Sequence, residues 1–271
     1  MLLNISRPDH LCERIAIKPR TILVTGAAAG INAAVAARLR DQGHRVIGAD
    51  LRDAEIVADL STESGRAGLV DRAADLAPGG LDGVVAGAGV SLPEDPGLAV
   101  RVNYFGAVAT LEGLHPLLAR SATPRAVAIV STAALLPSSA GTVAACLSGD
   151  EPRAIEAARA DPATAYLASK KALALWLRRS AITPRWAGNG IALNGIAPGG
   201  VHTAMMAGLD DSPQFQAVMA NTTPKAVAQY AQPQDLAEAI CWLATAETGF
   251  LLGQVLFVDG GTDAILRPDT F

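Results

Sequence analysis

The stretch Thr21-Ile22-Leu23-Val24-Thr25-Gly26-Ala27-Ala28-Ala29-Gly30-Ile31-Asn32 decides the fold. Its first half is a short apolar, β-branched run, which predicts a buried strand, and residues 33–39 are predicted to be helical. Strand, glycine turn and helix in this order are typical of a dinucleotide-binding unit. Glycines let the backbone approach a pyrophosphate, and the helix N-terminus favours its negative charge. The alternative is a tight turn between strand and helix without a ligand.

An acidic residue, Asp50, ends the next predicted strand, at 45–49. It follows the glycine turn by about twenty residues, the usual distance to the acid that binds a ribose in dinucleotide sites. A carboxylate accepts hydrogen bonds from a 2′-hydroxyl and repels a 2′-phosphate, so NAD is predicted over NADP. Arg52 lies close enough to accommodate a phosphate, which keeps NADP as the alternative.

Predicted strands and helices alternate along the whole chain. The strands are expected at 20–25, 45–49, 55–58, 81–86, 125–131, 191–194 and 254–258. With 271 residues, 50% of them hydrophobic, the chain can bury a large parallel sheet. We predict an α/β, Rossmann-type fold, a doubly wound parallel sheet of about seven strands with helices on both faces. Residues 21–271 are expected to form a single domain after an N-terminal arm at 1–20.

The composition disfavours several classes of function. A net charge of -4 provides no basic surface for nucleic acid. The uncharged stretch 126–149 contains Pro137, Gly141 and several Ser and Thr residues, so it is not predicted to span a membrane. Three separated cysteines without C-x-x-C spacing indicate reduced thiols in a cytoplasmic protein: Cys12, Cys146 and Cys241. Four histidines lack metal-ligand spacing, so no metal site is predicted: His10, His44, His115 and His202.

Tyr166 and Lys170 are four residues apart, so on a helix they share one face. Free tyrosine has a pKa of ~10, and an ammonium one turn away is expected to lower the pKa of the phenol by favouring the phenolate. Such a pair can transfer a proton to or from a hydroxyl or carbonyl oxygen. Alone the spacing is weak, because a packed ring beside a solvated amine has the same pattern.

Several short motifs occur in a fixed order. They are Thr25-Gly26-x-x-x-Gly30, Ala86-Gly87-Ala88-Gly89, Asn103, Ser131-Thr132, Tyr166-x-x-x-Lys170, Pro198-Gly199-x-x-x-Thr203 and Asp259-Gly260-Gly261. In this order they make the chain resemble the short-chain dehydrogenase/reductase family from residue 21 to the C-terminus. Finer runs at 50–55, 58–62, 102–106 and 267–271 are similar to the bacterial 3α-hydroxysteroid dehydrogenase/carbonyl reductase group.

The resemblance implies roles for the matched residues. Tyr166 would be the general acid in reduction and the base in oxidation. Lys170 would lower the tyrosine pKa and hold the nicotinamide ribose, and Asn103 would support a water that connects Lys170 to solvent. The implied NAD-binding residues are Gly26, Ala29, Gly30, Ile31, Asp50, Leu51, Asp59, Leu60, Gly87, Ala88, Gly89, Tyr166, Lys170, Pro198, Gly199, Val201 and Thr203.

Three positions depart from the family pattern. The role of the catalytic serine is assigned to Thr132, whose hydroxyl can donate the same hydrogen bond to a developing oxyanion. Adjacent Ser131 is the alternative. Only one of the two can face the substrate, because neighbouring residues on a strand point to opposite faces. Gly87 stands where the family often has asparagine, and Asn32 stands where a glycine is usual.

An insertion at 133–165 precedes the helix that carries Tyr166. It is predicted to be a loop of small residues followed by a short helix at 151–160. That Tyr helix commonly forms the oligomer interface in the family, so the insertion is expected either to block this packing or to rim the substrate cleft. A homodimer is therefore our hypothesis, and a homotetramer remains open.

These observations predict an NAD-dependent oxidoreductase that interconverts a secondary alcohol and a ketone. The expected substrate is small and apolar, such as a 3-hydroxysteroid or another cyclic or aryl carbonyl compound. Apolar residues either line the predicted cleft or only pack a lid: Val90, Leu92, Leu135, Leu136, Met205, Met206 and Leu209. One alternative is a non-catalytic NAD-binding sensor or scaffold. Another is an enzyme for a diol, a hydroxyacyl thioester or an aromatic alcohol.

Overall fold

The computed structural model describes residues 18–203 and 222–270. Most of the predicted N-terminal arm therefore lies outside the described residues, as do Met205, Met206 and Leu209. Within these ranges, the helices are all too short or too polar to cross a lipid bilayer.

Seven parallel strands form one sheet in the order β3-β2-β1-β4-β5-β6-β7. Their bounds are β1 Thr21–Thr25, β2 Arg45–Asp50, β3 Ile56–Val57, β4 Gly83–Ala86, β5 Arg125–Ile129, β6 Ala192–Pro198 and β7 Val255–Val258. The chain winds outward from β1 to β3 and then returns to β4 on the other side of β1. The order of strands thus reverses between β1 and β4, which is where open α/β sheets bind ligands. The predicted doubly wound α/β fold is confirmed.

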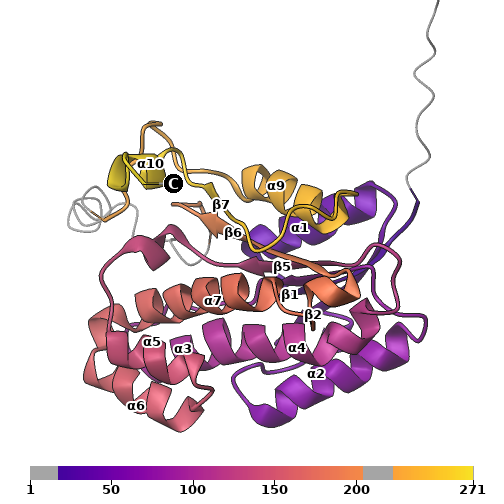
Figure 1. Cartoon of the computed structure of the whole chain (residues 1–271), viewed down its shortest axis with the longest axis horizontal. Helices are drawn as coiled ribbons and strands as arrows, with labels where there is room; N and C mark the ends of the chain where they lie inside the picture. The colour runs from indigo at the N-terminus through magenta and orange to yellow at the C-terminus, as the bar shows by residue number, and fades with distance from the viewer. Residues whose placement is uncertain (1–17, 204–221, 271) are drawn as a thin grey trace, which may run out of the picture.

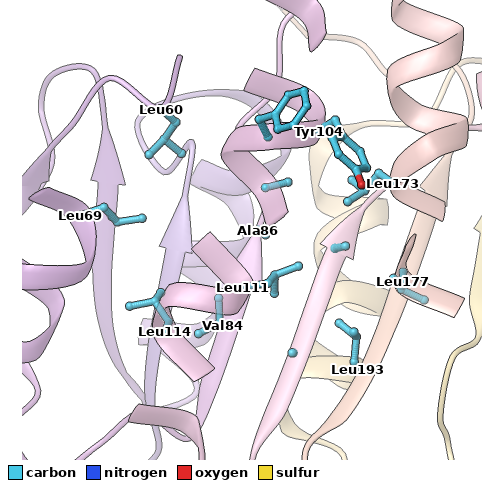
Figure 2. Packing of buried hydrophobic residues seen from close by; sticks show 14 of the residues in the cluster. Leu60, Leu69, Val84, Ala86, Tyr104, Leu111, Leu114, Leu173, Leu177 and Leu193 are labelled. Atoms are coloured by element: carbon cyan, nitrogen blue, oxygen red, sulfur yellow. The ribbon is translucent and has the colours of Figure 1, made fainter. Parts of the chain in front are cut away.

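Helices cover both faces of the sheet (Figure 1). On one face lie α1 Gly30–Asp41 and α9 Pro233–Thr245, and on the other lie α2 Glu63–Leu76, α4 Ala107–Leu118 and α7 Ala165–Ala181. Two separate clusters of buried apolar side chains result, one on each face. Leucines of α4 and α7 pack with residues of β4 and β6 in the larger cluster (Figure 2). The central strands are buried throughout, as their mainly apolar sequence predicts.

The helix predicted at 98–120 is divided into three parts. It begins as α3 Pro96–Val100, passes through a π-helical turn at Arg101–Gly106 and continues as α4. The side chain of Asp95 caps α3 by accepting a hydrogen bond from the Leu98 N–H. The π-helical turn contains Asn103 and is a local irregularity that hydrophobic periodicity does not reveal.

The insertion at 133–165 is more helical than predicted. Its elements are the 3₁₀ turn Thr132–Leu135, α5 Ala140–Leu147, α6 Glu151–Ala160 and the 3₁₀ turn Pro162–Thr164. The sequence predicted α6 at these bounds, but it predicted a loop where α5 lies. Ser139 caps α5 by accepting from the Thr142 N–H, and packing against α6 and α7 stabilises a segment of modest helix propensity. The predicted homodimer or homotetramer stays a prediction.

Short elements complete the described chain. They are the 3₁₀ turn Ala187–Asn189 and α10 Thr262–Leu266. A parallel bridge joins Val201 to Ala231, so the chain on either side of residues 204–221 is held together beside the carboxyl end of β6.

Candidate active site

A cavity of about 740 Å³ opens at the carboxyl ends of the strands. Every residue predicted from the sequence to bind NAD lines it, and Thr132 lines it too. Asn103 does not line the cavity and is fully buried. The volume falls within the usual range for small-molecule and cofactor sites.

The glycine turn forms one wall of this cavity. Gly26 and Gly30 have φ values of +73° and +59°, which favour glycine at both positions. A Cβ atom on Gly26 would lie only 3.0 Å from the Cα atom of Ala88, so the turn packs directly on the loop after β4. The hydroxyl oxygen of Thr25 holds that loop in place by accepting from the N–H groups of Gly87 and Ala88, at 3.0 and 3.1 Å.

Asp50 lies at the carboxyl end of β2, beside the same turn. One carboxylate oxygen accepts from the Ala28 N–H at 2.9 Å, and the other accepts from the Leu51 N–H at 2.7 Å. A ligand with a ribose 2′-phosphate would meet this negative charge. Arg52 extends into solvent, with its side chain 87% exposed, and does not line the cavity. The site therefore fits NAD better than NADP.

Tyr166 is the second residue of α7, and it lines the cavity together with Ser131. Burial raises the pKa of the Tyr166 phenol above its ordinary value, and the neighbouring Ser131 hydroxyl offsets part of that rise. The sequence predicted a lowered pKa from the nearby lysine. The direction in the structure is the opposite, because removing the phenolate from water is the larger effect.

Lys170 is 4% exposed and lies one turn beyond Tyr166. Its ammonium donates a 2.9 Å hydrogen bond to the carbonyl oxygen of Ile129 at the end of β5. Burial lowers the pKa of Lys170 from 10.5 to about 8. A Cβ atom on Gly89 would lie 3.4 Å from Nζ, so the amine reaches the cavity next to the loop after β4.

The hydroxyl groups of Ser131 and Thr132 have different hydrogen-bond partners. The Thr132 side chain is buried, and its hydroxyl donates to the carbonyl oxygen of Pro198 at 3.2 Å. The Ser131 hydroxyl accepts a hydrogen bond from the Ala133 N–H. It lies close enough to the phenol of Tyr166 to lower the pKa of that phenol. This geometry favours Ser131 over Thr132. A strand was predicted up to residue 131, but β5 ends at Ile129. Beyond that residue, side chains no longer alternate between the two faces of the sheet.

The buried side chain of Asn103 forms hydrogen bonds with the loop after β4 and with α7. Its side-chain carbonyl accepts from the Val90 N–H at 2.8 Å, and its amide donates to the Val90 carbonyl at 2.9 Å. The same amide reaches the Ser169 hydroxyl at 3.2 Å. Because the side chain is fully engaged, Asn103 links the loop after β4 to helix α7.

The described lining of the cavity is mainly apolar. Val90 and Leu136 line it as predicted, whereas Leu92 and Leu135 do not. The sequence analysis did not single out several further lining residues: Ser91, Leu98, Val102, Leu167, Thr222 and Thr223. Ser91 follows the glycine-rich loop directly and could have been found from that position. Residues 222 and 223 carried no sequence signal.

Comparisons with known proteins agree with this geometry. A family model described as enoyl-(acyl carrier protein) reductase matches residues 26–263. The 3-alpha-hydroxysteroid dehydrogenase/carbonyl reductase of Comamonas testosteroni is 36% identical, over 92% of this chain and 99% of that protein. The cis-4-hydroxycyclohexanecarboxylate dehydrogenase of Sinomonas cyclohexanicum is 33% identical, also over 92% and 99%. The NADH complex of a 3-alpha-hydroxysteroid dehydrogenase from Pseudomonas sp. B-0831 has a TM-score of 0.86 and 41% identity, over 93% of this chain and all of that one.

The buried charge of Lys170 predicts a dependence of stability on pH. Below pH 8 the folded protein must hold the charged amine, which costs free energy relative to the unfolded chain, whose lysine pKa is 10.5. We expect Lys170→Met to raise the free energy of unfolding at pH 7 by about 1–2 kcal/mol. The gain should shrink between pH 8 and 10.5, where the wild-type lysine is neutral when folded.

Urea unfolding of both proteins at pH 7 and at pH 9.5 measures this effect. Lys171→Met, at the next position of α7, controls for the loss of one positive charge. A Lys170→Met protein that is less stable than wild type at pH 7 would contradict the assignment, as would a difference that does not change with pH.

Proposed function

The chain belongs to the short-chain dehydrogenase/reductase family and is an NAD-dependent oxidoreductase, and on that premise we propose that it interconverts a cyclic secondary alcohol and its ketone. The observation that carries the proposal is that Tyr166, Lys170 and Ser131 line one cavity, with Tyr166 and Lys170 one turn apart on α7. We assign the proton transfer to Tyr166.

The cofactor would bind along the strand ends. Asp50 would accept from the adenosine ribose hydroxyls, and the turn from Gly26 to Gly30 would approach the pyrophosphate. Lys170 would hold the nicotinamide ribose, and Thr203 the carboxamide. Bound in this way, NAD supplies a hydride acceptor and NADH a hydride donor.

Tyr166 would then move a proton at the substrate oxygen. In reduction the phenol donates its proton to the carbonyl oxygen, and in oxidation the phenolate accepts the hydroxyl proton. The raised pKa keeps the phenol protonated at neutral pH, so the resting side chain is ready to act as the acid. Ser131 would donate a hydrogen bond to the same oxygen and stabilise the charge that develops there.

An uncharged ring compound suits the substrate end of the cavity. In the described part of the lining, the charged side chains are Asp50, Asp59 and Lys170, all assigned to the cofactor. The other described side chains of the lining are uncharged, and all of them except the amide of Asn32 are apolar or hydroxylated. Both curated relatives compared above are named for a hydroxyl group on a carbocycle. The second is named for a ring that also carries a carboxylate, but the described lining here offers no basic side chain besides Lys170 to pair with one. We therefore propose a hydroxysteroid or a similar neutral cyclic alcohol, in preference to a carboxylate or a thioester.

Nicotinamide turnover by the purified protein tests the proposal, with NAD and NADP compared in parallel. The substrates are a 3α-hydroxysteroid, cyclohexanol, an aryl secondary alcohol and cis-4-hydroxycyclohexanecarboxylate. We expect turnover with NAD, faster for neutral rings than for the carboxylate. Tyr166→Phe should lose about 10²–10⁴-fold in kcat. NADH binding without turnover of any alcohol or ketone would instead indicate a sensor or scaffold, and preference for NADP would contradict the role of Asp50.

The two adjacent hydroxyls make separable predictions. Ser131→Ala should lower kcat by about 10²–10³-fold, because a donor to the developing oxyanion is lost. Thr132→Val keeps the shape of the side chain and removes a hydrogen bond to Pro198, so we expect about 0.5–1.5 kcal/mol less stability and a smaller change in kcat. Steady-state kinetics and urea unfolding of both variants measure the difference. A larger kcat loss in Thr132→Val would return the role to Thr132.

A further inference from the structure

Asn32 and Gly87 meet at the cavity wall although 55 positions separate them in the chain. Asn32 lies in the first turn of α1 and is 8% exposed, and Gly87 directly follows β4. The Asn32 amide nitrogen donates a 2.8 Å hydrogen bond to the Gly87 carbonyl oxygen. This bond fixes the orientation of the amide, because only its NH₂ group can donate to a carbonyl.

In its observed position, the Asn32 side chain leaves no room for a Cβ atom at position 87. A Cβ atom there would lie 2.2 Å from Oδ1 and 2.5 Å from Cγ of Asn32, closer than real Cβ atoms approach other atoms. The backbone of Gly87 is not in the left-handed region, so its conformation alone would accept another residue. The requirement for glycine thus comes from the side chain at position 32.

The amide lies between two segments that line the cavity. On one side, a Cβ atom on Gly26 would lie 3.0 Å from the Asn32 amide nitrogen, so the amide packs on the glycine turn. On the other side it holds the Gly87 carbonyl, while Thr25 accepts from the N–H groups of Gly87 and Ala88. Both polar groups of the Gly87 backbone are therefore fixed from the side of β1 and α1.

Stability alone does not account for an asparagine at this position. The Asn32 carbonyl oxygen Oδ1 is buried, and no described residue donates a hydrogen bond to it. A half-satisfied buried amide costs free energy, so its benefit must lie in what the other half of the amide positions.

We propose that Asn32 is a positioning residue that fixes the Gly87–Gly89 loop against the glycine turn, and that Asn32 and Gly87 act as one coupled pair that sets the affinity for NAD. The inference rests on the proposed function, because it requires the cofactor to lie against this wall. Asn32 itself makes no chemical contribution to the reaction.

A double-mutant cycle on the full-length protein tests the coupling by fluorescence titration with NADH. Gly87→Ala should raise the Kd for NADH by about tenfold or more, since the new methyl group collides with Asn32. Asn32→Gly should raise it by about three- to tenfold through the lost hydrogen bond. In the double variant the collision is relieved, so adding Gly87→Ala to Asn32→Gly should change the Kd by less than about twofold. Gly68→Ala, in α2 with open space around its Cβ position, is the matched control.

Steady-state kinetics separate positioning from general stability. In Asn32→Gly the effect should fall on the KM for NAD rather than on kcat. An equal cost of Gly87→Ala in both backgrounds would overturn the coupling, and an Asn32→Gly protein that loses only thermal stability would overturn the positioning role.

Should Gly87→Ala not fold, a folded double variant that binds NADH supports the pair, and failure of the double variant overturns it. A wild-type protein that binds no NADH would overturn this inference together with the proposed function, whereas binding without coupling would overturn the inference alone.

Discussion

The central strands of the sheet are buried on both faces, and this constraint decides where the chemistry can occur. Residues of β4, β5 and β6 face apolar helices on either side, so a polar side chain along them needs a buried partner, as Asn194 has in the backbone of Leu251 and Gln254. Functional side chains are confined to the carboxyl edge, where the strands end and glycine turns leave room. The order of strands reverses there between β1 and β4, which opens the cavity.

Burial of the charged Lys170 side chain at this edge of the sheet costs free energy. Its ammonium is removed from water and has one carbonyl partner, that of Ile129, within the described residues. The hydrogen bond fastens α7 to the end of β5 and so holds Tyr166 against Ser131. Burial shifts both titratable side chains toward their neutral forms, which suits the proton transfer proposed for Tyr166.

The sequence predicted most of the framework, because strand patterns, glycine turns and the acid after the second strand are local features. It failed where tertiary packing decides. Helix α5 is stabilised by its neighbours despite a weak helix signal. The choice between Thr132 and Ser131 stays a prediction, because the sequence does not locate the end of β5 to within two residues. The pKa of Tyr166 was misjudged, since burial is not visible in the spacing of two residues.

The central claim is that the cavity directs hydride transfer between a substrate carbon and the nicotinamide, with Tyr166 moving the proton. Single-turnover oxidation of a cyclic alcohol deuterated at its carbinol carbon tests this claim most directly, with the NADH product analysed by mass spectrometry. We expect one deuterium in the NADH formed by the wild-type protein and none detectable on the same timescale with Tyr166→Phe. NADH without deuterium, or undiminished transfer in the variant, would contradict it.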